Sequence, residues 1–170
     1  MGNIEKKWVV REPGNPASVR QLAQELGIDQ VLANLLVQRG IDTFAKAREF
    51  FRPDLSMLHD PFLMQDMGKA VERIDAAIRD KERIFVYGDY DVDGTTAVSL
   101  IYSFFRRFTT NLEYYIPDRY DEGYGVSYKG IDVAKDHGCT LLITLDCGIK
   151  AVEKVKYAKS FGIDVIICDH

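Results

Sequence analysis

From Arg83 to the end of the chain, short apolar runs alternate with segments that have a helical period. Two of these runs contain Leu141-Leu142-Ile143 and Val165-Ile166-Ile167 without a polar interruption. Unbroken runs are typical of strands covered on both faces, and strands that alternate with helices join into a parallel sheet through right-handed crossovers. The pattern therefore predicts an α/β fold, with a parallel β-sheet and helices on both faces. The expected strands are 83–88, 112–116, 139–145 and 164–168, and the expected helices lie near 95–108, 127–137 and 150–161.

The first 82 residues have helical rather than strand-like patterns. Ser18 and Gln21 have the spacing of a capping box ahead of apolar residues with a helical period, and two more short helices are expected to follow. After a loop rich in Pro and Asp, the apolar residues within Met67–Ile78 predict an amphipathic helix that leads into the first strand. We therefore expect a small helical N-terminal region, residues 1–65, followed by an α/β domain, residues 66–170.

Composition bounds the class of protein. Of the 170 residues, 46% are hydrophobic and 28% are charged, which is ordinary for a globular protein with one good core. No apolar stretch approaches the length of a membrane span and the N-terminus has no signal-peptide segment, so we expect a cytoplasmic protein with no membrane partner. The net charge of −4 is unusual for a nucleic-acid-binding domain. If the aspartates at the expected strand ends belong to a metal site, however, the rest of residues 83–170 has a small positive charge.

The segment GDYDVDG, residues 88–94, has Asp89, Asp91 and Asp93 at alternate positions directly after an apolar run. In an extended chain these three carboxylates would line one side of the strand end. Like charges at this range repel and raise one another's pKa. The repulsion is relieved if the segment curls so that each carboxylate reaches water, or if a cation binds between them. For the segment taken alone, an acidic turn is the simpler interpretation.

The ends of the other expected strands favour a binding site. Open parallel sheets bind their ligands beyond the carboxyl ends of the strands, and the later strands end in Asp118-Arg119, Asp146 and Asp169-His170. All four ends therefore bring polar, mostly acidic groups to one edge of the sheet. Carboxylates with one imidazole suit Mn²⁺ or Mg²⁺. Two such ions about 4 Å apart activate water and stabilise the leaving oxygen in phosphoester hydrolysis.

A zinc site is an alternative at the same edge. Cys147, Cys168 and His170 lie near the expected strand ends, but their spacing is not that of a zinc finger. Adjacent strand residues such as Cys168 and Asp169 also point in opposite directions. The sequence therefore favours oxygen ligands over a cysteine site.

Four segments together resemble the successive motifs of the DHH phosphoesterase superfamily, and most closely those of its single-stranded-DNA exonucleases. These segments are GDYDVDGTTA (88–97), IPDRYDEGYGVS (116–127), ITLDCGI (143–149) and IICDH (166–170). Four motifs in the same order are far more specific than any one of them. The resemblance extends from about Asp66 to the last residue, with a weaker similarity in the N-terminal segment.

The resemblance implies roles for particular residues. The metal ligands are expected to be Asp89, Asp91, Asp93, Asp146, Asp169 and His170, with Asp91, Asp93, Asp146 and His170 catalytic. Asp146 resembles the ligand that bridges two metal ions, and Asp89 could instead support the ligands from behind. The segment from Arg119 through Gly123 and Tyr124 to Gly125 is expected to contact substrate phosphate, through a guanidinium group and close backbone approach.

Thr95 and Thr96 are further candidates for binding phosphate. They open the helix expected at 95–108, where Thr95 would be the cap, and the free N–H groups of a helix start can bind an anion. This expectation comes from the helix boundary alone.

The resemblance also implies an activity. It is metal-dependent hydrolysis of single-stranded DNA from the 5′ end in recombination and repair, with Mn²⁺ or Mg²⁺ as cofactor and a single-stranded-DNA-binding protein as a candidate partner. The superfamily is named for an Asp-His-His motif, whereas this sequence has Asp169-His170 as its last two residues. We therefore expect an N-terminal fragment that binds metal weakly and cleaves DNA slowly or not at all.

Three other functions are open at this point. Asp-x-Asp-Gly-Thr after a strand also opens the haloacid-dehalogenase-type phosphatases, in which Asp91 would be the nucleophile and Asp93 the acid/base, but no paired aspartates follow on a later strand. A DHH enzyme could instead act on small nucleotides or short oligonucleotides. A non-catalytic scaffold with the same fold would have lost metal ligands, whereas the ligands that match the family pattern are present here.

Overall fold

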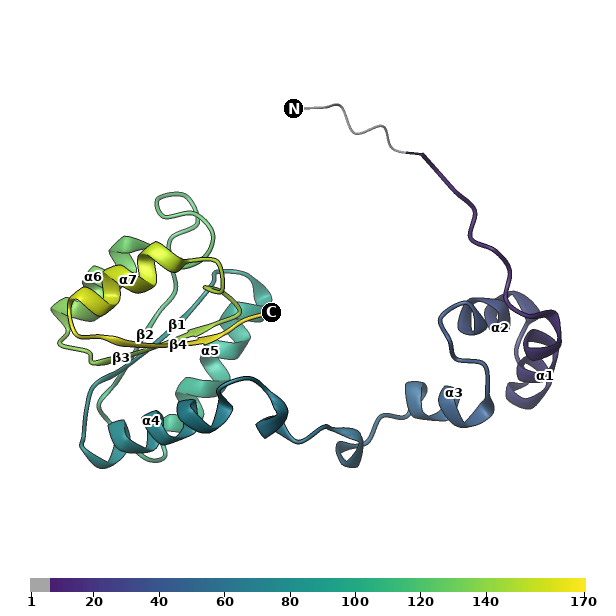
Figure 1. Ribbon diagram of the computed structural model, residues 1–170, viewed down its shortest axis with the longest axis horizontal. Helices are drawn as coiled ribbons and strands as arrows, with labels where there is room; N and C mark the ends of the chain where they lie inside the picture. Colours follow the sequence, from purple (N-terminus) through teal and green to yellow (C-terminus); the bar gives the residue numbers. More distant parts are fainter. Residues whose placement is uncertain (1–6) are drawn as a thin grey trace. The chain divides into compact units, whose positions relative to one another are not determined.

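The computed structural model describes residues 7–170 and divides the chain into two compact units, with the division between Asp60 and Pro61. The first unit is helical (Figure 1). Its elements are α1 (Pro16–Leu26), α2 (Gln30–Val37), α3 (Phe44–Phe51) and the 3-10 turn η1 (Leu55–Met57). Leu22, Ala33 and Ala47, one from each α-helix, are fully buried in its core. The sequence predicted a boundary between residues 65 and 66, a few residues after this division.

The starts of these helices follow from local capping. Asn15 caps α1, and its side-chain oxygen accepts hydrogen bonds from the Ala17 and Ser18 amides at 2.9 and 3.3 Å. The predicted capping box at Ser18 is therefore wrong, because Pro16 already occupies the first helical turn, where its missing N–H costs nothing. Asp29 and Thr43 cap α2 and α3 in the same way as Asn15 caps α1.

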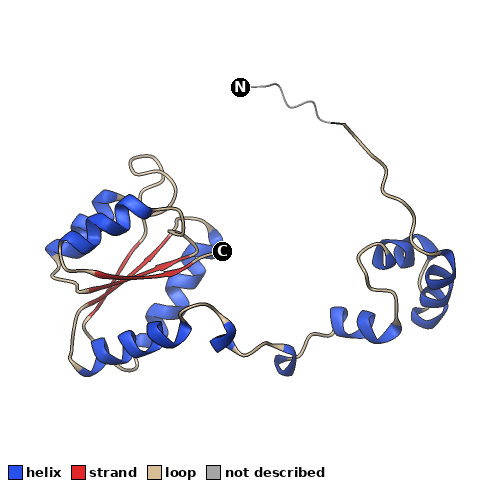
Figure 2. Cartoon of the chain, in the orientation of Figure 1, coloured by secondary structure: helices blue, strands red, loops and turns tan. Residues whose placement is uncertain are grey.

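The second unit is a parallel sheet with helices on both faces, which confirms the predicted α/β class (Figure 2). Its helical elements are η2 (Pro61–Leu63), α4 (Met67–Arg79), α5 (Val92–Phe105), α6 (Tyr128–Asp136) and α7 (Val152–Ser160). Its strands are β1 (Ile84–Gly88), β2 (Leu112–Tyr115), β3 (Leu141–Leu145) and β4 (Asp164–Cys168). The strand order is β2-β1-β3-β4, with every neighbouring pair parallel.

Alternate residues of the central strand pack into different layers. Ile84 and Val86 belong to the core cluster that includes Val98 of α5, whereas Phe85 and Tyr87 belong to the cluster that includes Ile131 of α6. Helices α4 and α5 cover one face of the sheet and α6 and α7 cover the other (Figure 1). This two-sided burial explains why the β1 and β3 sequences are apolar throughout.

The strand order fixes where a ligand can bind. The chain leaves β1 towards β2 on one side and then returns past β1 to reach β3 on the other side. Such a reversal opens a crevice beyond the carboxyl ends of the two central strands. The segments that follow Gly88 and Leu145 therefore lie on either side of this crevice. Within residues 7–170, no helix is both long and apolar enough to cross a bilayer.

Candidate metal and phosphate site

A groove with about 660 Å³ of space lies at the carboxyl ends of the strands. Five of the six predicted metal ligands line it. They are Asp91, Asp93, Asp146, Asp169 and His170. Four carboxylates and one imidazole form a donor set that suits Mn²⁺ or Mg²⁺. The chemistry of the groove therefore fits a divalent metal ion.

These donors are not gathered at one point. In the part of the chain that the structure describes, no three His, Cys, Asp or Glu side chains are close enough together to hold a metal ion. His170 Nε2 lies 3.8 Å from Asp146 Oδ1, and the His170 side chain is 97% exposed. The sequence predicted carboxylates drawn into one pocket, whereas the structure brings them to one groove and leaves them apart. The same finding tells against the zinc alternative, in which Cys168 would be a ligand but does not line the groove.

Asp89 is not part of the groove lining. It is 0% exposed, its Oδ1 accepts a hydrogen bond from the Tyr90 amide, and its Oδ2 accepts one from the Gly125 amide, both at 2.7 Å. Because each carboxylate oxygen is bonded to a backbone N–H, Asp89 ties the end of β1 to the 116–127 loop. In this structure Asp89 is therefore separated from the groove, and its role in support of the ligands stays a prediction.

The GDYDVDG segment is not extended. Strand β1 ends at Gly88, and α5 begins at Val92 with Asp91 as its N-cap. Asp91 Oδ1 accepts a hydrogen bond from the Gly94 amide at 2.9 Å. A Cβ on Gly94 would lie 2.5 Å from the Asp89 carbonyl oxygen, so glycine is required where the helix packs on the strand end. The three carboxylates therefore do not line one strand edge, as they would in an extended chain; the segment is a strand end, a turn and a helix start.

The same helix boundary changes the interpretation of two threonines. Helix α5 begins three residues before Thr95, whose amide donates to the Asp91 carbonyl at 3.0 Å within the helix. The Thr95 hydroxyl also donates to that carbonyl, at 2.7 Å. The prediction that Thr95 and Thr96 offer free amides to a phosphate is therefore wrong. The first-turn amides of α5 belong to Val92, Asp93 and Gly94, and the Gly94 amide is already bonded to Asp91 Oδ1.

The backbone after β3 adopts an unusual conformation at Asp146. Asp146 has φ of 57°, in the left-handed region that non-glycine residues seldom adopt. Its amide donates to the Cys168 carbonyl at 2.8 Å, which continues the pairing of β3 with β4. Asp169 Oδ2 accepts a hydrogen bond from the Ile149 amide at 2.9 Å. The two strand ends that carry Asp146 and Asp169 are thus tied to one another.

The 116–127 loop folds around a carboxylate that the sequence analysis missed. Glu122 Oε1 accepts hydrogen bonds from the Tyr115 hydroxyl at 2.7 Å and the Asp118 amide at 2.9 Å, and the Ser127 hydroxyl donates to Oε2. Its side chain is 3% exposed. Burial favours the neutral form, but the hydrogen bonds from Ser127, Asp118 and Tyr115 outweigh it, so the pKa of Glu122 lies below its ordinary value. No local pattern distinguishes Glu122 from the other acidic residues of the loop.

Tyr87 holds the other end of this loop. Its hydroxyl donates to the Gly125 carbonyl at 2.9 Å and accepts from the Ser127 amide at 3.0 Å. Burial raises the pKa of Tyr87 to about 12. Together with Asp89, Tyr87 fixes the backbone on both sides of Gly125, which lines the groove.

The predicted phosphate-binding residues of the loop divide into two groups. Tyr124 and Gly125 line the groove, whereas Arg119 and Gly123 do not. The Tyr124 hydroxyl donates to Asp91 Oδ2 at 3.3 Å, and the Asp91 charge is the largest of the effects that raise the pKa of Tyr124 to about 12. The Arg119 guanidinium lies 5.2 Å from the centre of the Tyr90 ring. Arg119 is therefore exposed beside the groove rather than within it.

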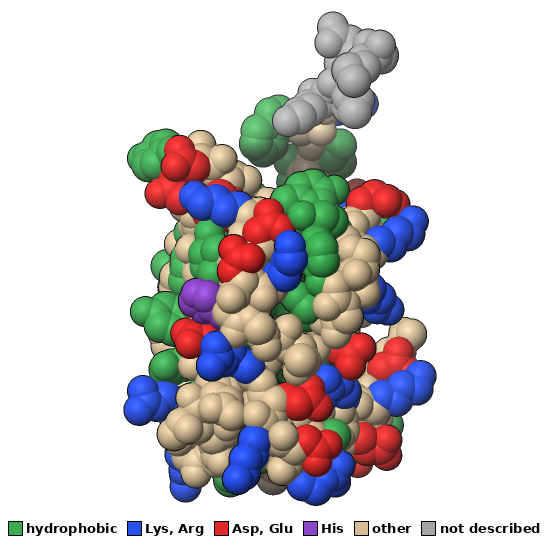
Figure 3. Space-filling model, turned by 90° about the vertical axis from the view of Figure 1, so that its left-hand side faces the viewer, with side chains coloured by type: hydrophobic (Ala, Val, Ile, Leu, Met, Phe, Trp, Pro, Cys, Tyr) green, Lys and Arg blue, Asp and Glu red, His purple; other side chains and the backbone are tan. Residues whose placement is uncertain are grey.

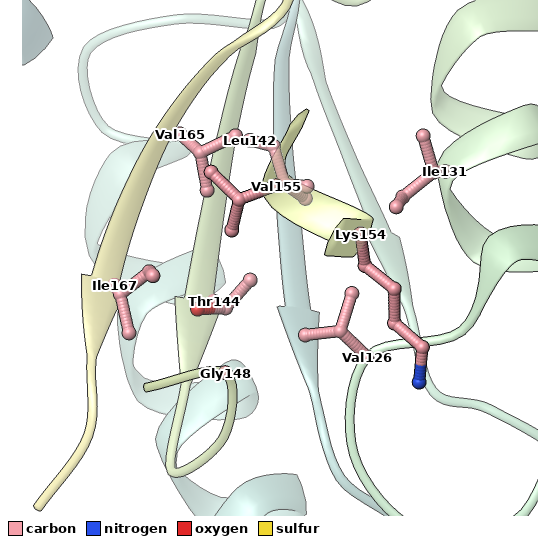
Figure 4. A pocket seen from close by; sticks show the side chains of 9 residues that line it. All are labelled: Val126, Ile131, Leu142, Thr144, Gly148, Lys154, Val155, Val165 and Ile167. Carbon is pink, nitrogen blue, oxygen red and sulfur yellow. The ribbon is translucent and has the colours of Figure 1, made fainter. Parts of the chain in front are cut away.

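An apolar hollow lies between the sheet and α7 (Figure 4). Its lining includes Val126, Leu142, Val155 and Ile167, and it has no room for a water molecule. Thr144 Oγ1, in the same lining, is a buried oxygen without a hydrogen-bond partner among the described residues. The hollow has no room for a polar ligand. The groove, which is lined by the carboxylates, is therefore the candidate binding site.

Comparison with known proteins found similar sequences. The model of the DHH family, N-terminal domain, matches residues 83–170. The RecJ single-stranded-DNA-specific exonuclease of Bacillus subtilis is 41% identical over 164 residues, which cover 96% of this chain and 21% of that protein. The corresponding RecJ protein of Escherichia coli is 37% identical over 142 residues, covering 82% of this chain and 24% of that protein.

Solved structures agree with these matches. An exonuclease RecJ bound to manganese is 31% identical, with a TM-score of 0.56, over 60% of this chain and 26% of that chain. RecJ from Thermus thermophilus in complex with Mn²⁺ has a TM-score of 0.68 and covers 94% of this chain and 22% of that chain; at 24% identity it supports the fold alone. The chain thus spans about a fifth to a quarter of the length of the relatives that it matches.

Proposed function

Because the chain belongs to the DHH family, we propose that it acts in the metal-dependent hydrolysis of phosphodiester bonds in single-stranded DNA. The observation that carries the proposal is the groove, where Asp91, Asp146 and His170 arrive from three different strand ends. Relatives at 41% and 37% identity bear the name of single-stranded-DNA-specific exonucleases, and a relative's structure was solved with manganese. Family membership also makes the haloacid-dehalogenase alternative untenable.

The finer parts of the proposal follow from the same resemblance. We propose Mn²⁺ or Mg²⁺, as one or two ions, held by Asp91, Asp93, Asp146 and His170 with support from Asp169. When bound, such ions supply water activation and neutralise charge on the reacting phosphate. We further propose 5′ to 3′ degradation, a role in recombination and repair in the cytoplasm, and a single-stranded-DNA-binding protein as partner.

The chain's own residues would position the substrate. Tyr124 and Gly125 reach the groove from the loop that Tyr87, Asp89 and Glu122 hold in place. A phosphate oxygen can approach the backbone closely at Gly125, which has φ of 84° and no side chain. Arg119 lies outside the groove and would meet a neighbouring part of the strand.

Metal affinity is expected to be weak and turnover slow. The candidate ligands do not form a close group within residues 7–170, so metal binding must first draw like charges together. This repulsion makes the free energy of metal binding less favourable.

Calorimetric titration with Mn²⁺ tests the proposal. We expect binding heat for the unmodified chain, its loss in Asp146→Asn, and its retention in Asp136→Asn, a matched change of an exposed carboxylate at the end of α6. Hydrolysis of end-labelled single-stranded DNA should depend on Mn²⁺ and on Asp146, and should release products from the 5′ end. Identical Mn²⁺ heats for both variants would overturn the proposal, and preferential cleavage of dinucleotides would favour a small-substrate DHH enzyme instead.

A further inference from the structure

Two lysines line the acidic groove. Lys150 follows β3 and Lys154 lies in the first turn of α7. Among the described residues that line this groove, they are the ones with a permanent positive charge, beside four carboxylates and His170. The groove therefore has an anionic side, built by the strand ends, and a cationic side at the start of α7.

Neither lysine is neutralised by the chain. Within residues 7–170 the ion pairs of lysine involve Lys46, Lys69, Lys129 and Lys156, and neither groove lysine takes part in one. Lys154 Nζ lies 5.9 Å from the centre of the Tyr128 ring. Its aliphatic stem passes Val126 at the edge of the apolar hollow, with the nitrogen directed away from that hollow (Figure 4). Packing thus orients Lys154 and leaves its charge free.

A polyanion needs such charges to reach this groove. The carboxylates repel the phosphates of a nucleic-acid strand, and the repulsion must be offset by cations nearby. On the face shown in Figure 3, Lys and Arg alternate with Asp and Glu and form no large basic area. The position of the groove lysines, rather than the net charge, can therefore decide where a strand binds.

We propose that Lys150 and Lys154 bind the phosphate backbone of a single-stranded nucleic acid on the α7 side of the groove, next to the phosphodiester that faces the carboxylates. This inference rests on the proposed function, because it assigns the path of the same substrate. Lys150 and Lys154 are binding residues, and they take no part in the bond-breaking step.

Salt-dependent DNA binding by the 170-residue chain tests the inference. The probe is a fluorescein-labelled oligothymidylate, followed by fluorescence anisotropy in the presence of a chelator so that no hydrolysis occurs. The test variant is Lys150→Gln/Lys154→Gln. The control is Lys156→Gln/Lys159→Gln, which removes the same charge from exposed positions of α7 outside the groove. Circular dichroism confirms that both variants are folded.

The expected difference lies in the slope of log affinity against log salt concentration. Each lost phosphate contact on a single strand lowers the magnitude of this slope by about 0.7, so the groove variant should lose about 1.4 and the control should match the unmodified chain. Equal slopes for the two variants, or no binding by the unmodified chain, would overturn the inference. If the groove variant has a smaller salt slope but hydrolysis does not depend on Asp146, the proposed function fails and the lysine site stands. If its slope is unchanged and hydrolysis does depend on Asp146, the lysine site alone fails.

Discussion

The β1 side and the β4 side of the groove hold their carboxylates in different ways. On the β1 side, Asp89 is fully buried with both oxygens bonded to amides, and Asp91 caps α5. On the β4 side, Asp169 bonds the Ile149 amide near the surface, and the His170 side chain is 97% exposed. The difference teaches that the fold buries and bonds the acidic segment after β1, whereas it leaves the acidic segment after β4 near the surface.

The largest expected effect comes from the matched pair Asp89→Asn and Asp169→Asn. In Asp89→Asn, at least one partly buried amide, of Tyr90 or Gly125, loses its acceptor, and we expect the free energy of unfolding to fall by about 3 kcal/mol. In Asp169→Asn, water can replace the lost acceptor, so a change below about 1 kcal/mol is expected. Urea denaturation of both variants measures the contrast. Equal losses of stability would break the comparison between the two sides.

An intermediate effect is expected for Glu122→Gln. The amide cannot accept all the hydrogen bonds that the carboxylate accepts from Tyr115, Asp118 and Ser127, so we expect a loss of about 2 kcal/mol at neutral pH. Stability should be measured by urea denaturation, with Asp121→Gln, an exposed position in the same loop, as control. A loss no larger than that of the control would show that the loop on the β1 side is held by other contacts.

The lowered pKa of Glu122 predicts that the stability of the chain depends on pH. The pKa of Glu122 lies below its ordinary value of 4.5, so its contribution to stability is complete above that value and is lost as the pH falls through the lower pKa of the folded state. The unmodified chain should therefore lose more stability on acidification than Glu122→Gln does. Denaturation curves at neutral and acidic pH check this. Parallel acid losses in the two proteins would contradict the assigned cause.

The smallest expected effect is a gain in stability, from a substitution on β3 where it pairs with β4. Thr144→Val replaces the buried hydroxyl that has no hydrogen-bond partner among the described residues with a methyl group of similar shape. Because the hollow around it excludes water, removing the polar atom should raise the free energy of unfolding by about 1 kcal/mol. Thr140→Val is the contrasting control, because the Thr140 hydroxyl donates a hydrogen bond to the Glu82 carboxylate. Destabilisation by Thr144→Val would mean that its hydroxyl has a partner after all.

The elements of the α/β unit could be predicted from the sequence because periodicity reports burial directly. The predicted strand 164–168 has the observed bounds of β4, and the other strands differ from prediction by at most two residues at an end. The helix was predicted near 95–108, whereas α5 begins at Val92, because the aspartates after β1 were assigned to the strand end rather than to a helix start. An Asp followed three residues later by a glycine that packs on the strand end marks the earlier start, but that packing becomes visible only in three dimensions.

Roles within the candidate site were harder to predict. Asp89 and Asp91 look equivalent in the sequence, yet one is buried against the Gly125 amide and the other caps a helix and lines the groove. Gly125 is 36 residues from Asp89, so no local pattern could reveal their contact. The same holds for Glu122, whose partners include the end of β2 and the start of α6.

The sequence by itself determined the type and order of the elements and the acidic character of the strand ends, because hydrophobic period and local charge are properties of neighbouring residues. The tertiary structure alone decided that β1 and β3 lie side by side in the order β2-β1-β3-β4, and therefore which carboxylates face one groove. It also decided which of them are bonded to backbone amides and which remain free for a ligand. Those outcomes depend on contacts between residues far apart in the chain, and burial of one carboxylate or exposure of another follows from the packing of the whole unit.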